Sequence, residues 1–268
     1  MTLSVPVHRV LSLAPSNTEI LFAIGAGIEV VACDDFSDYP PETLKLPRIG
    51  STEGKLNKER IIVLEPDLLL AAEINSLEQV KSLEDLKLKV FLLRNPTTFE
   101  NLFENIALVG QITGHYGEAT RLVASLKKRI EEVEEKLKGV KARPRVFYEL
   151  DATDAAKPWS IGSGTFLDTL ITMAGGINFA APSSQSFPRI PAETIVREDP
   201  DVIILGDASY GVSAASLAQR AGWERLSAVR GGKVYSFDDN LASRPGPRLV
   251  DALEILANLL HPEAFPKD

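Results

Sequence analysis

An internal repeat constrains the fold of this chain more than any other feature. Residues 59–70, ERIIVLEPDLLL, match residues 193–204, ETIVREDPDVII. Each copy has a glutamate, a short helix-like stretch, an acidic residue, Pro-Asp and then an unbroken apolar run, which is typical of a buried parallel strand. Pro66 aligns with Pro200, and Glu59 with Glu193. The repeat predicts that both halves of the chain carry the same structural unit.

Strand-like and helix-like segments alternate on both sides of the middle of the chain. Strands are predicted at residues 9–13, 29–33, 66–72, 89–93, 145–150, 200–205 and 233–237. Helices are predicted at residues 17–25, 57–65, 76–86, 163–176, 192–199 and 246–260. This order predicts the α/β class, with two lobes built on central, mostly parallel sheets.

One long helix separates the two lobes. Apolar residues recur at helical spacing at positions 116, 119, 122 or 123, 126, 130, 133 and 137, and Gly139 is a stop signal. We therefore predict a helix of ~20 to 25 residues, which is ~30 to 38 Å long, ending at residue 138. The predicted domains are an N-terminal lobe at 1–112, a connector helix at 113–141 and a C-terminal lobe at 142–268.

Charge and composition exclude some partners and leave the compartment open. The net charge of −8 and pI near 5.1 argue against a nucleic-acid backbone as the main partner. The single cysteine, Cys33, allows no intrachain disulfide. No apolar run is long enough to span a bilayer, and the first ten residues lack the apolar core of a signal peptide. These features fit either a cytoplasmic protein or a mature, exported one.

The sequence offers little that predicts catalysis. The histidines at positions 8, 115 and 261 have no metal-ligating neighbour at short spacing, and the common nucleotide, zinc and nucleophile motifs are missing. Asp34, Asp35 and Asp38 are interpreted as a hydrated loop, and Ser163 as a helix N-cap. We expect no catalytic residue, no bound metal and no enzymatic activity.

Four aromatic residues fall in loops where ligands commonly stack. Phe36, Tyr39, Trp159 and Phe187 all lie in Pro- or Gly-rich segments at the ends of predicted strands or helices. A single loop aromatic is usually packing, but four in similar positions favour a ligand-binding role.

Several motifs together resemble a known class of protein. They are RVLSLAPSNTEILFAIGAG, FSDYPPE, LNKERIIVLEPDLLLA, PWSIGSGTFLDTLITMAGGINFA and RPGPRLVDALEILANLLHP. Over about residues 9–262 the chain resembles the substrate-binding proteins of ABC importers that have one helical connector, and it is most similar to the cobalamin-binding members. The resemblance implies two Rossmann-like lobes joined by one long helix, a ligand in the cleft between them and small hinge motion.

The resemblance also implies which residues contact the ligand. Phe36 falls where the cobalamin binders have a tyrosine, Trp159 where they have a phenylalanine, and Phe187 where they have a tryptophan. Arg244 matches an arginine beside the amide rim of the ligand, and Asn240 in the same segment is expected to contact the ligand too.

Two positions differ from the cobalamin-binding proteins, and two others are expected to contact the transporter. Glu53 and Ala72 stand where the cobalamin binders have tryptophans; Glu53 remains an expected ligand contact, and both departures leave the precise ligand open. Glu59 and Glu193 match two surface glutamates that dock such proteins onto arginines of the permease. Either glutamate also suits a helix N-terminus on electrostatic grounds alone.

The resemblance leads to one expected function and two alternatives. The chain is expected to capture cobalamin or a related corrinoid outside the cytoplasmic membrane and to deliver it to an ABC permease. It would be a monomer, periplasmic or held at the cell surface by a lipid anchor, that binds no nucleic acid and has no cofactor besides this ligand. A first alternative is a haem or ferric siderophore, with Tyr39 or Tyr210 as iron ligand or Arg48, Arg189 and Arg244 as cations. The second is an enzyme of nitrogenase-like or chelatase-like topology.

Overall fold

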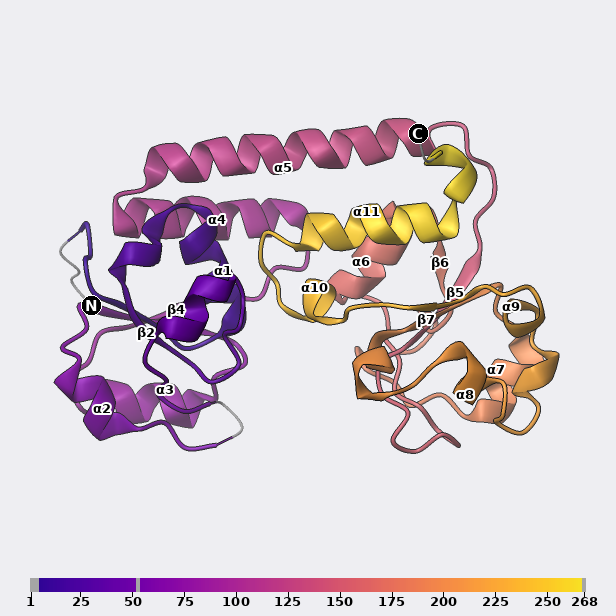
Figure 1. The fold of residues 1–268 in the computed structure, drawn as a ribbon, viewed down its shortest axis with the longest axis horizontal. Helices are drawn as coiled ribbons and strands as arrows, with labels where there is room; N and C mark the ends of the chain where they lie inside the picture. Colours follow the sequence, from indigo (N-terminus) through magenta and orange to yellow (C-terminus); the bar gives the residue numbers. More distant parts are fainter. Residues whose placement is uncertain (1–4, 52–53, 267–268) are drawn as a thin grey trace. The chain divides into compact units, whose positions relative to one another are not determined.

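The computed structural model describes residues 5–51 and 54–266, which form two compact units. Unit 1 contains the described residues up to Lys128 together with Arg244–Pro247, and unit 2 contains Arg129–Ser243 and the described residues from Arg248 onward. Each unit holds one four-stranded parallel sheet with helices packed around it (Figure 1). The α/β class predicted from the sequence is confirmed.

Unit 1 has the strand order β2-β1-β3-β4. Its strands are β1 (Val10–Ser12), β2 (Val30–Cys33), β3 (Leu68–Ala72) and β4 (Val90–Leu93). Its helices are α1 (Pro15–Ala23), α2 (Lys58–Val63), α3 (Leu77–Glu84) and α4 (Phe99–Thr113), with short 3-10 helices η1 (Ala26–Glu29) and η2 (Pro41–Lys45).

Unit 2 repeats the same order as β6-β5-β7-β8. Its strands are β5 (Arg145–Glu149), β6 (Ile177–Asn178), β7 (Val202–Leu205) and β8 (Val234–Ser236). Its helices are α6 (Phe166–Met173), α7 (Ala192–Glu198), α8 (Ala214–Leu217), α9 (Ser227–Arg230), α10 (Asn240–Ser243) and α11 (Leu249–Leu260), with 3-10 helices η3 (Gly206–Tyr210), η4 (Trp223–Arg225) and η5 (Pro262–Ala264).

The predicted long helix is confirmed as α5 (Tyr116–Leu137), which has 22 residues. Its residues up to Lys128 belong to unit 1, and those from Arg129 belong to unit 2. The chain visits unit 1 a second time through Arg244–Pro247. This short return is a feature that the pattern of strands and helices did not predict.

The sequence repeat corresponds to a structural repeat. Glu65 and Asp199 both adopt a left-handed backbone, with φ of 44° and 45°, directly before the aligned prolines. The aspartates that follow those prolines also act alike: Asp67 accepts a hydrogen bond from the backbone N–H of Arg9, and Asp201 accepts one from that of Arg145. Each pair ties the start of a central strand to the start of its neighbour, so the same local design positions both sheets.

Each sheet is covered by its own apolar core. In unit 1, Leu11 and Leu69 from the sheet pack with Ile61 of α2, and all three are fully buried. In unit 2, Ile203 packs with the repeat-related Ile195 of α7 in a cluster that includes Phe147, Ile195, Ile203 and Trp223. Burying such side chains stabilises each unit by about 1.5–3 kcal/mol per residue.

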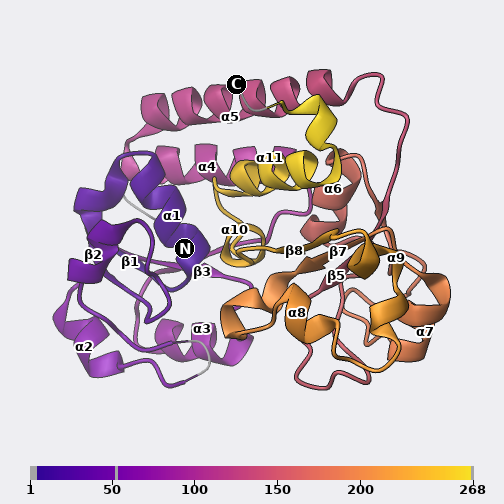
Figure 2. The same ribbon diagram turned by 45° about the vertical axis from the view of Figure 1, so that its right-hand side comes forward.

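Helices α6 and α11 run side by side on unit 2 (Figures 1 and 2). Their C-terminal ends meet where His261 Nε2 lies 3.2 Å from the carbonyl oxygen of Gly175.

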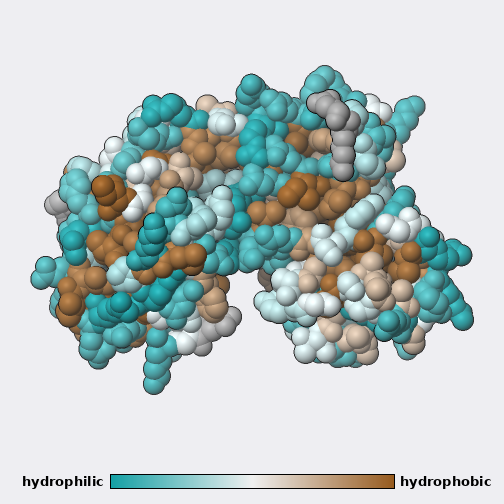
Figure 3. Space-filling model, in the orientation of Figure 1, coloured by the Kyte–Doolittle hydropathy of each residue, from teal (hydrophilic) through white to brown (hydrophobic). Residues whose placement is uncertain are grey.

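The surface mixes apolar and hydrophilic areas on the face seen in Figure 3. Within the described part of the chain, no helix combines the length and apolar character needed to cross a membrane.

The structure differs from the local predictions in several places, and α4 was not among the predicted helices. Helix α1 begins at Pro15 rather than at residue 17, since proline suits the first turn of a helix. The N-cap of α6 is Thr165, whose side chain accepts a hydrogen bond from the N–H of Asp168, so the assignment of Ser163 was wrong. Strand β6 was missed because only two residues pair with β5, too few to give an alternating pattern.

Candidate ligand-binding site

The carboxyl ends of parallel strands meet at one edge of a sheet, where α/β proteins commonly bind ligands. In unit 1 this edge consists of residues 14–18, 34–39 and 72–75, together with 244–247; we call it the unit-1 edge. In unit 2 it consists of residues 150–159, 206–212 and 238–240; we call it the unit-2 edge. The two edges are described one at a time.

Buried polar side chains hold the unit-1 edge together. Thr18 Oγ1 lies 2.8 Å from Ser12 Oγ and 2.7 Å from Ser37 Oγ, which joins α1 to the ends of β1 and β2. Asn17 Nδ2 donates to the carbonyl oxygen of Leu70 in β3 at 3.0 Å. The polar residues after β1 therefore have a structural role, because their side chains form hydrogen bonds inside the protein that connect neighbouring strands.

The side chains of Asp34 and Arg48 hold the backbone of the loop after β2 in place. Asp34 accepts hydrogen bonds from the hydroxyl of Ser37 and the N–H of Phe36, while burial raises the pKa of its carboxyl. Arg48 donates to the carbonyl oxygens of Asp34 and Ser37 at 2.8 and 2.7 Å. The Phe36 side chain is 43% exposed above this anchored turn. The loop thus presents a large aromatic face on a fixed backbone.

Cys33 and Tyr39 flank this turn in different environments. The Arg48 guanidinium also donates to Cys33 Sγ at 3.0 Å, yet burial raises the pKa of this thiol to about 11. Cys33 is therefore a protonated, buried thiol at neutral pH and offers no nucleophile. Tyr39, by contrast, is 43% exposed, as Phe36 is.

Arg244 reaches the unit-1 edge from the returning segment. Its guanidinium pairs with Asp38, and Glu19 Oε1 of α1 lies 3.9 Å away. A side chain at Gly246 would come within 3.3 Å of Glu19 Oε2, so the segment packs closely on α1. Because Glu19 is buried, Arg244 places a positive charge near a buried carboxyl group as well as lining the edge.

Trp159 lies on an extended segment of the unit-2 edge. Its backbone N–H donates to the carbonyl oxygen of Asp151 at 2.7 Å. The residue is 41% exposed, and the Arg189 guanidinium lies 5.5 Å from the centroid of its ring. Residues 186–190 are hydrogen-bonded to residues 158–162 and carry Phe187, which is 51% exposed. Arg189 is itself paired with Asp154 at 2.5 Å. Trp159 and Phe187 thus expose aromatic surface from segments whose backbones are hydrogen-bonded to each other.

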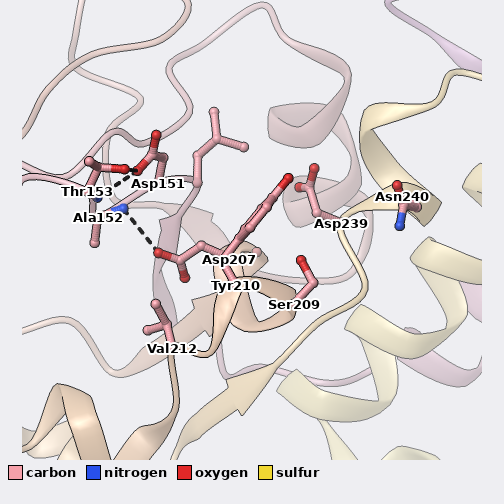
Figure 4. Close-up of a pocket in the computed structure, with 11 residues that line it drawn as sticks. Asp151, Ala152, Thr153, Asp207, Ser209, Tyr210, Val212, Asp239 and Asn240 are labelled. Carbon is pink, nitrogen blue, oxygen red and sulfur yellow. Dashed lines mark hydrogen bonds between the residues drawn. The ribbon is translucent and has the colours of Figure 1, made fainter. Parts of the chain in front are cut away.

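A pocket of about 500 Å³ opens at the unit-2 edge (Figure 4). Three aspartates from three different strand ends line it: Asp151 after β5, Asp207 after β7 and Asp239 after β8. Neutral polar groups complete the wall; they are Thr153, Ser209, Tyr210 and Asn240. Among these residues the sequence analysis named Asn240 as a ligand contact and Tyr210 as an iron ligand in the haem alternative; the aspartates were missed, although an acidic residue soon after each apolar strand was a visible signal.

The three carboxyl groups have different protonation behaviour. Burial, and then the charge of Glu149, raise the pKa of Asp207 to about 6. Burial also raises the pKa of Asp239, which accepts a hydrogen bond from the Tyr148 hydroxyl at 2.5 Å. Hydrogen bonds from the side chain and backbone of Thr153 instead lower the pKa of Asp151. At neutral pH the pocket is therefore an anionic surface.

A buried ion pair lies beneath the pocket. Glu149, fully buried at the end of β5, accepts two hydrogen bonds from Arg220 at 2.5 and 2.8 Å. The Arg220 guanidinium also stacks 4.8 Å from the centroid of Trp223. This bidentate ion pair fixes the orientation of the Arg220 guanidinium, so its charge is directed at Glu149 rather than at the pocket.

The structure places the other predicted residues as follows. Glu59 and Glu193 are exposed in the first turns of α2 and α7, so they occupy equivalent positions in the repeat. Ala72 is buried at the end of β3. Glu53 lies outside the described residues. Within residues 5–51 and 54–266, no three His, Cys, Asp or Glu side chains are grouped to hold a metal ion.

A family model described as periplasmic binding protein matches residues 10–241 of the chain. The chain belongs to the periplasmic binding protein family. An ABC transporter substrate-binding lipoprotein of Bacillus subtilis is 30% identical to it over 99% of this chain and 83% of the relative. A cobalamin-binding protein of Halobacterium salinarum is 29% identical over 97% of this chain and 71% of the relative.

Solved structures agree with the family assignment. The periplasmic vitamin B12 binding protein of Vibrio cholerae matches with a TM-score of 0.81 and 26% identity, covering 98% of this chain and 99% of that one. A periplasmic heme-binding protein of Roseiflexus sp. RS-1 matches with a TM-score of 0.84 and 29% identity, covering 96% and 99%. This periplasmic binding protein is thus a substrate-binding protein of the ABC-transporter class, in a family of solute binders rather than enzymes.

Proposed function

We propose that this periplasmic binding protein captures cobalamin or a related corrinoid and delivers it to the permease of an ABC importer. The observation that carries the proposal is the pair of exposed aromatic side chains, Phe36 at the unit-1 edge and Trp159 at the unit-2 edge. Flat aromatic faces on anchored backbones suit the apolar surface of a large macrocycle. Relatives named for cobalamin and vitamin B12 binding support the same ligand.

The charges at the two edges favour a neutral ligand rim over an anionic one. The three arginines that could attract an anionic ferric siderophore already have protein partners: Arg48 bonds backbone carbonyls, Arg189 pairs with Asp154, and Arg244 pairs with Asp38. Ion pairing of this kind reduces the attraction that each guanidinium offers a ligand. The anionic pocket at the unit-2 edge adds repulsion toward carboxylate groups.

Haem is the second candidate ligand. A solved relative is named a heme-binding protein, and Tyr210 is 89% exposed beside the unit-2 pocket, where a phenolate could ligate iron. However, haem carries two propionate groups, which the aspartates of this pocket would repel. We therefore rank haem below a corrinoid.

Delivery would use the repeated glutamates. Glu59 and Glu193 present one exposed carboxylate on each unit, at the start of equivalent short helices. A two-fold permease presents two equivalent surfaces, which suits a partner with an internal repeat. In this proposal the protein acts as a monomer outside the cytoplasmic membrane, either free in a periplasm or held by a lipid anchor.

The experiment that tests the proposal measures binding of cyanocobalamin to variants of both edges. Phe36→Ala and Trp159→Ala should each weaken binding by about tenfold or more, because each removes an aromatic contact. Tyr116→Ala, which removes a 57% exposed aromatic from the first turn of α5, is the matched control and should leave affinity unchanged. Unchanged affinity in both edge variants, or tighter binding of haemin than of cyanocobalamin to the wild type, would contradict the proposal.

A further inference from the structure

The most buried carboxylate of the unit-2 pocket has an unmet hydrogen-bonding oxygen. Asp207 is 3% exposed, and its Oδ2 accepts a hydrogen bond from the N–H of Ala152 at 3.0 Å. Its Oδ1 has no hydrogen-bond partner among the described residues, although Asp207 lines the pocket (Figure 4). Buried polar atoms are nearly always paired, so an orphaned acceptor in a pocket wall indicates a place for a donor from a ligand.

The surroundings of Asp207 restrict the charge of that donor group. The pocket also contains Asp151 and Asp239, and no lysine, arginine or histidine occurs among the lining residues that the structure describes. Arg220, whose charge acts on Asp207, directs two guanidinium nitrogens at Glu149. A carboxylate entering this pocket would be repelled and would bring no proton to donate, whereas a neutral N–H donor meets acceptors.

A carboxamide is a neutral group that matches the polar side chains of the lining. Its two N–H groups can be accepted by aspartate oxygens, and its carbonyl oxygen can accept from a hydroxyl or an amide. Tyr210, Ser209 and Asn240 supply those donors from η3 and the start of α10. Corrinoids carry acetamide and propionamide side chains around the ring, whereas haem carries carboxylates at its rim.

We propose that the unit-2 pocket is a carboxamide-selecting subsite, in which Asp207 accepts a hydrogen bond from a primary amide of the ligand and a carboxylate at the same position is excluded. This inference rests on the proposed function and deepens it, because it assigns the choice between amidated and acidic ligands to one residue. Asp207 is a specificity residue in this account, and the aromatic side chains supply the general affinity.

The test compares cyanocobalamin with its monocarboxylic acids, in each of which one side-chain amide is replaced by a carboxylate. The wild type should bind cyanocobalamin about tenfold or more tightly than at least one of these acids. In Asp207→Asn, the asparagine oxygen can still accept from Ala152, while its N–H₂ group turns a hydrogen-bond donor toward the pocket. This variant should bind that acid more tightly than the wild type does and should narrow the preference for the amide.

Glu224→Gln is the matched control, because it removes one negative charge from an exposed position of the same unit. It should leave the ratio between amide and acid unchanged. A wild type that binds all the acids as well as cyanocobalamin overturns the carboxamide subsite but leaves the proposed function standing, and this result needs no variant. An unchanged ratio in folded Asp207→Asn also overturns it. A wild type that binds no cyanocobalamin overturns the proposed function, and the subsite with it.

Discussion

Asp207 shows how one residue combines a functional position with a cost to folding. Burial of its carboxyl, with Glu149 nearby, raises its pKa from 3.8 to about 6, so the charged form is less stable in the folded protein than in the unfolded chain. Charged groups face it from several elements: Glu149 of β5, Arg220 after α8, and Asp151 and Asp239 in the pocket wall. Buried charges that lower stability are common at binding sites, where residues are selected for ligand contacts rather than for stability.

Asp207→Asn is predicted to stabilise the folded protein, and the gain should depend on pH. Because the folded pKa is raised, the free energy of unfolding of the wild type falls as pH rises from about 4 to about 6. The variant has no such loss. Its advantage should therefore be small near pH 4, grow up to about pH 6 and stay level above it, at no more than about 3 kcal/mol. Urea unfolding at a series of pH values measures this difference.

Asp151→Asn provides a control of opposite sign in the same pocket. Thr153 lowers the pKa of Asp151, so its ionised form adds stability above the ordinary aspartate range, and that stability is lost as pH falls. This variant should be less stable than the wild type near neutral pH and similar to it in acid. If both variants shifted stability in the same direction at neutral pH, the assignment of the two environments would be wrong.

At the scale of elements, the repeat gives α2 and α7 equivalent roles in their units. Both helices bury one isoleucine, Ile61 or Ile195, under the sheet, and both are followed by a left-handed residue that directly precedes a proline. Both also expose a glutamate in the first turn. A carboxylate there is favoured by the helix dipole, worth about 0.3–1 kcal/mol, so folding alone explains an acid at each position. Only transport measurements separate the structural role from docking.

Charge reversal at both helices is predicted to impair transport without affecting ligand binding. The double variant Glu59→Lys and Glu193→Lys should bind cyanocobalamin like the wild type, because neither residue belongs to the unit-1 or unit-2 edge. Uptake of cobalamin by cells that depend on this protein and its importer should fall sharply, because lysines would repel arginines on the permease. Glu131→Lys on the exposed side of α5 is the control for added charge. Normal uptake by the double variant would refute docking through these residues.

The junction of α6 and α11 gives a second prediction at this scale. Gly175 has φ of +83°, and an added Cβ would lie 2.6 Å from His261 Nε2. Gly164 has a similar φ of +80°, but an added Cβ there meets nothing within 4 Å. Gly164→Ala should cost about 1–2 kcal/mol from backbone strain alone. Gly175→Ala should cost at least about 1 kcal/mol more, because His261 must also move.

Thermal or urea unfolding of the two alanine variants measures this difference. Equal losses would mean that the two helices separate easily at Gly175, against the close packing seen in unit 2. The comparison isolates the steric contribution, since both substitutions place alanine in the left-handed region.

For the molecule as a whole, the sequence predicted the fold better than the site. Short, mainly apolar runs identified all the strands of the described residues except the two-residue β6, and the Pro-Asp repeat predicted the same structural unit in both halves. These features are local in sequence, so periodicity detects them. The second visit of the chain to unit 1, at Arg244–Pro247, depends on tertiary contacts with Glu19 and Asp38, which no local pattern encodes.

The candidate site residues of each unit were harder to predict because they come from distant segments of the chain. Phe36, Trp159 and Phe187 were predicted as ligand contacts from their Pro- or Gly-rich loops and from the family resemblance, and all three are exposed in the structure. The partners of Arg48 were not predicted, because it donates hydrogen bonds to backbone carbonyl oxygens, which every residue type has. The pocket joins aspartates from three strand ends, which sheet pairing alone brings together.

The most direct test of the central claim is a calorimetric titration of the wild-type protein with cyanocobalamin near neutral pH. Our account predicts saturable one-to-one binding with a dissociation constant below about 1 μM, equivalent to a binding free energy of about −8 kcal/mol or stronger. No saturable heat with cyanocobalamin, together with saturable binding of haemin under the same conditions, would contradict the corrinoid assignment and make haem the ligand to pursue.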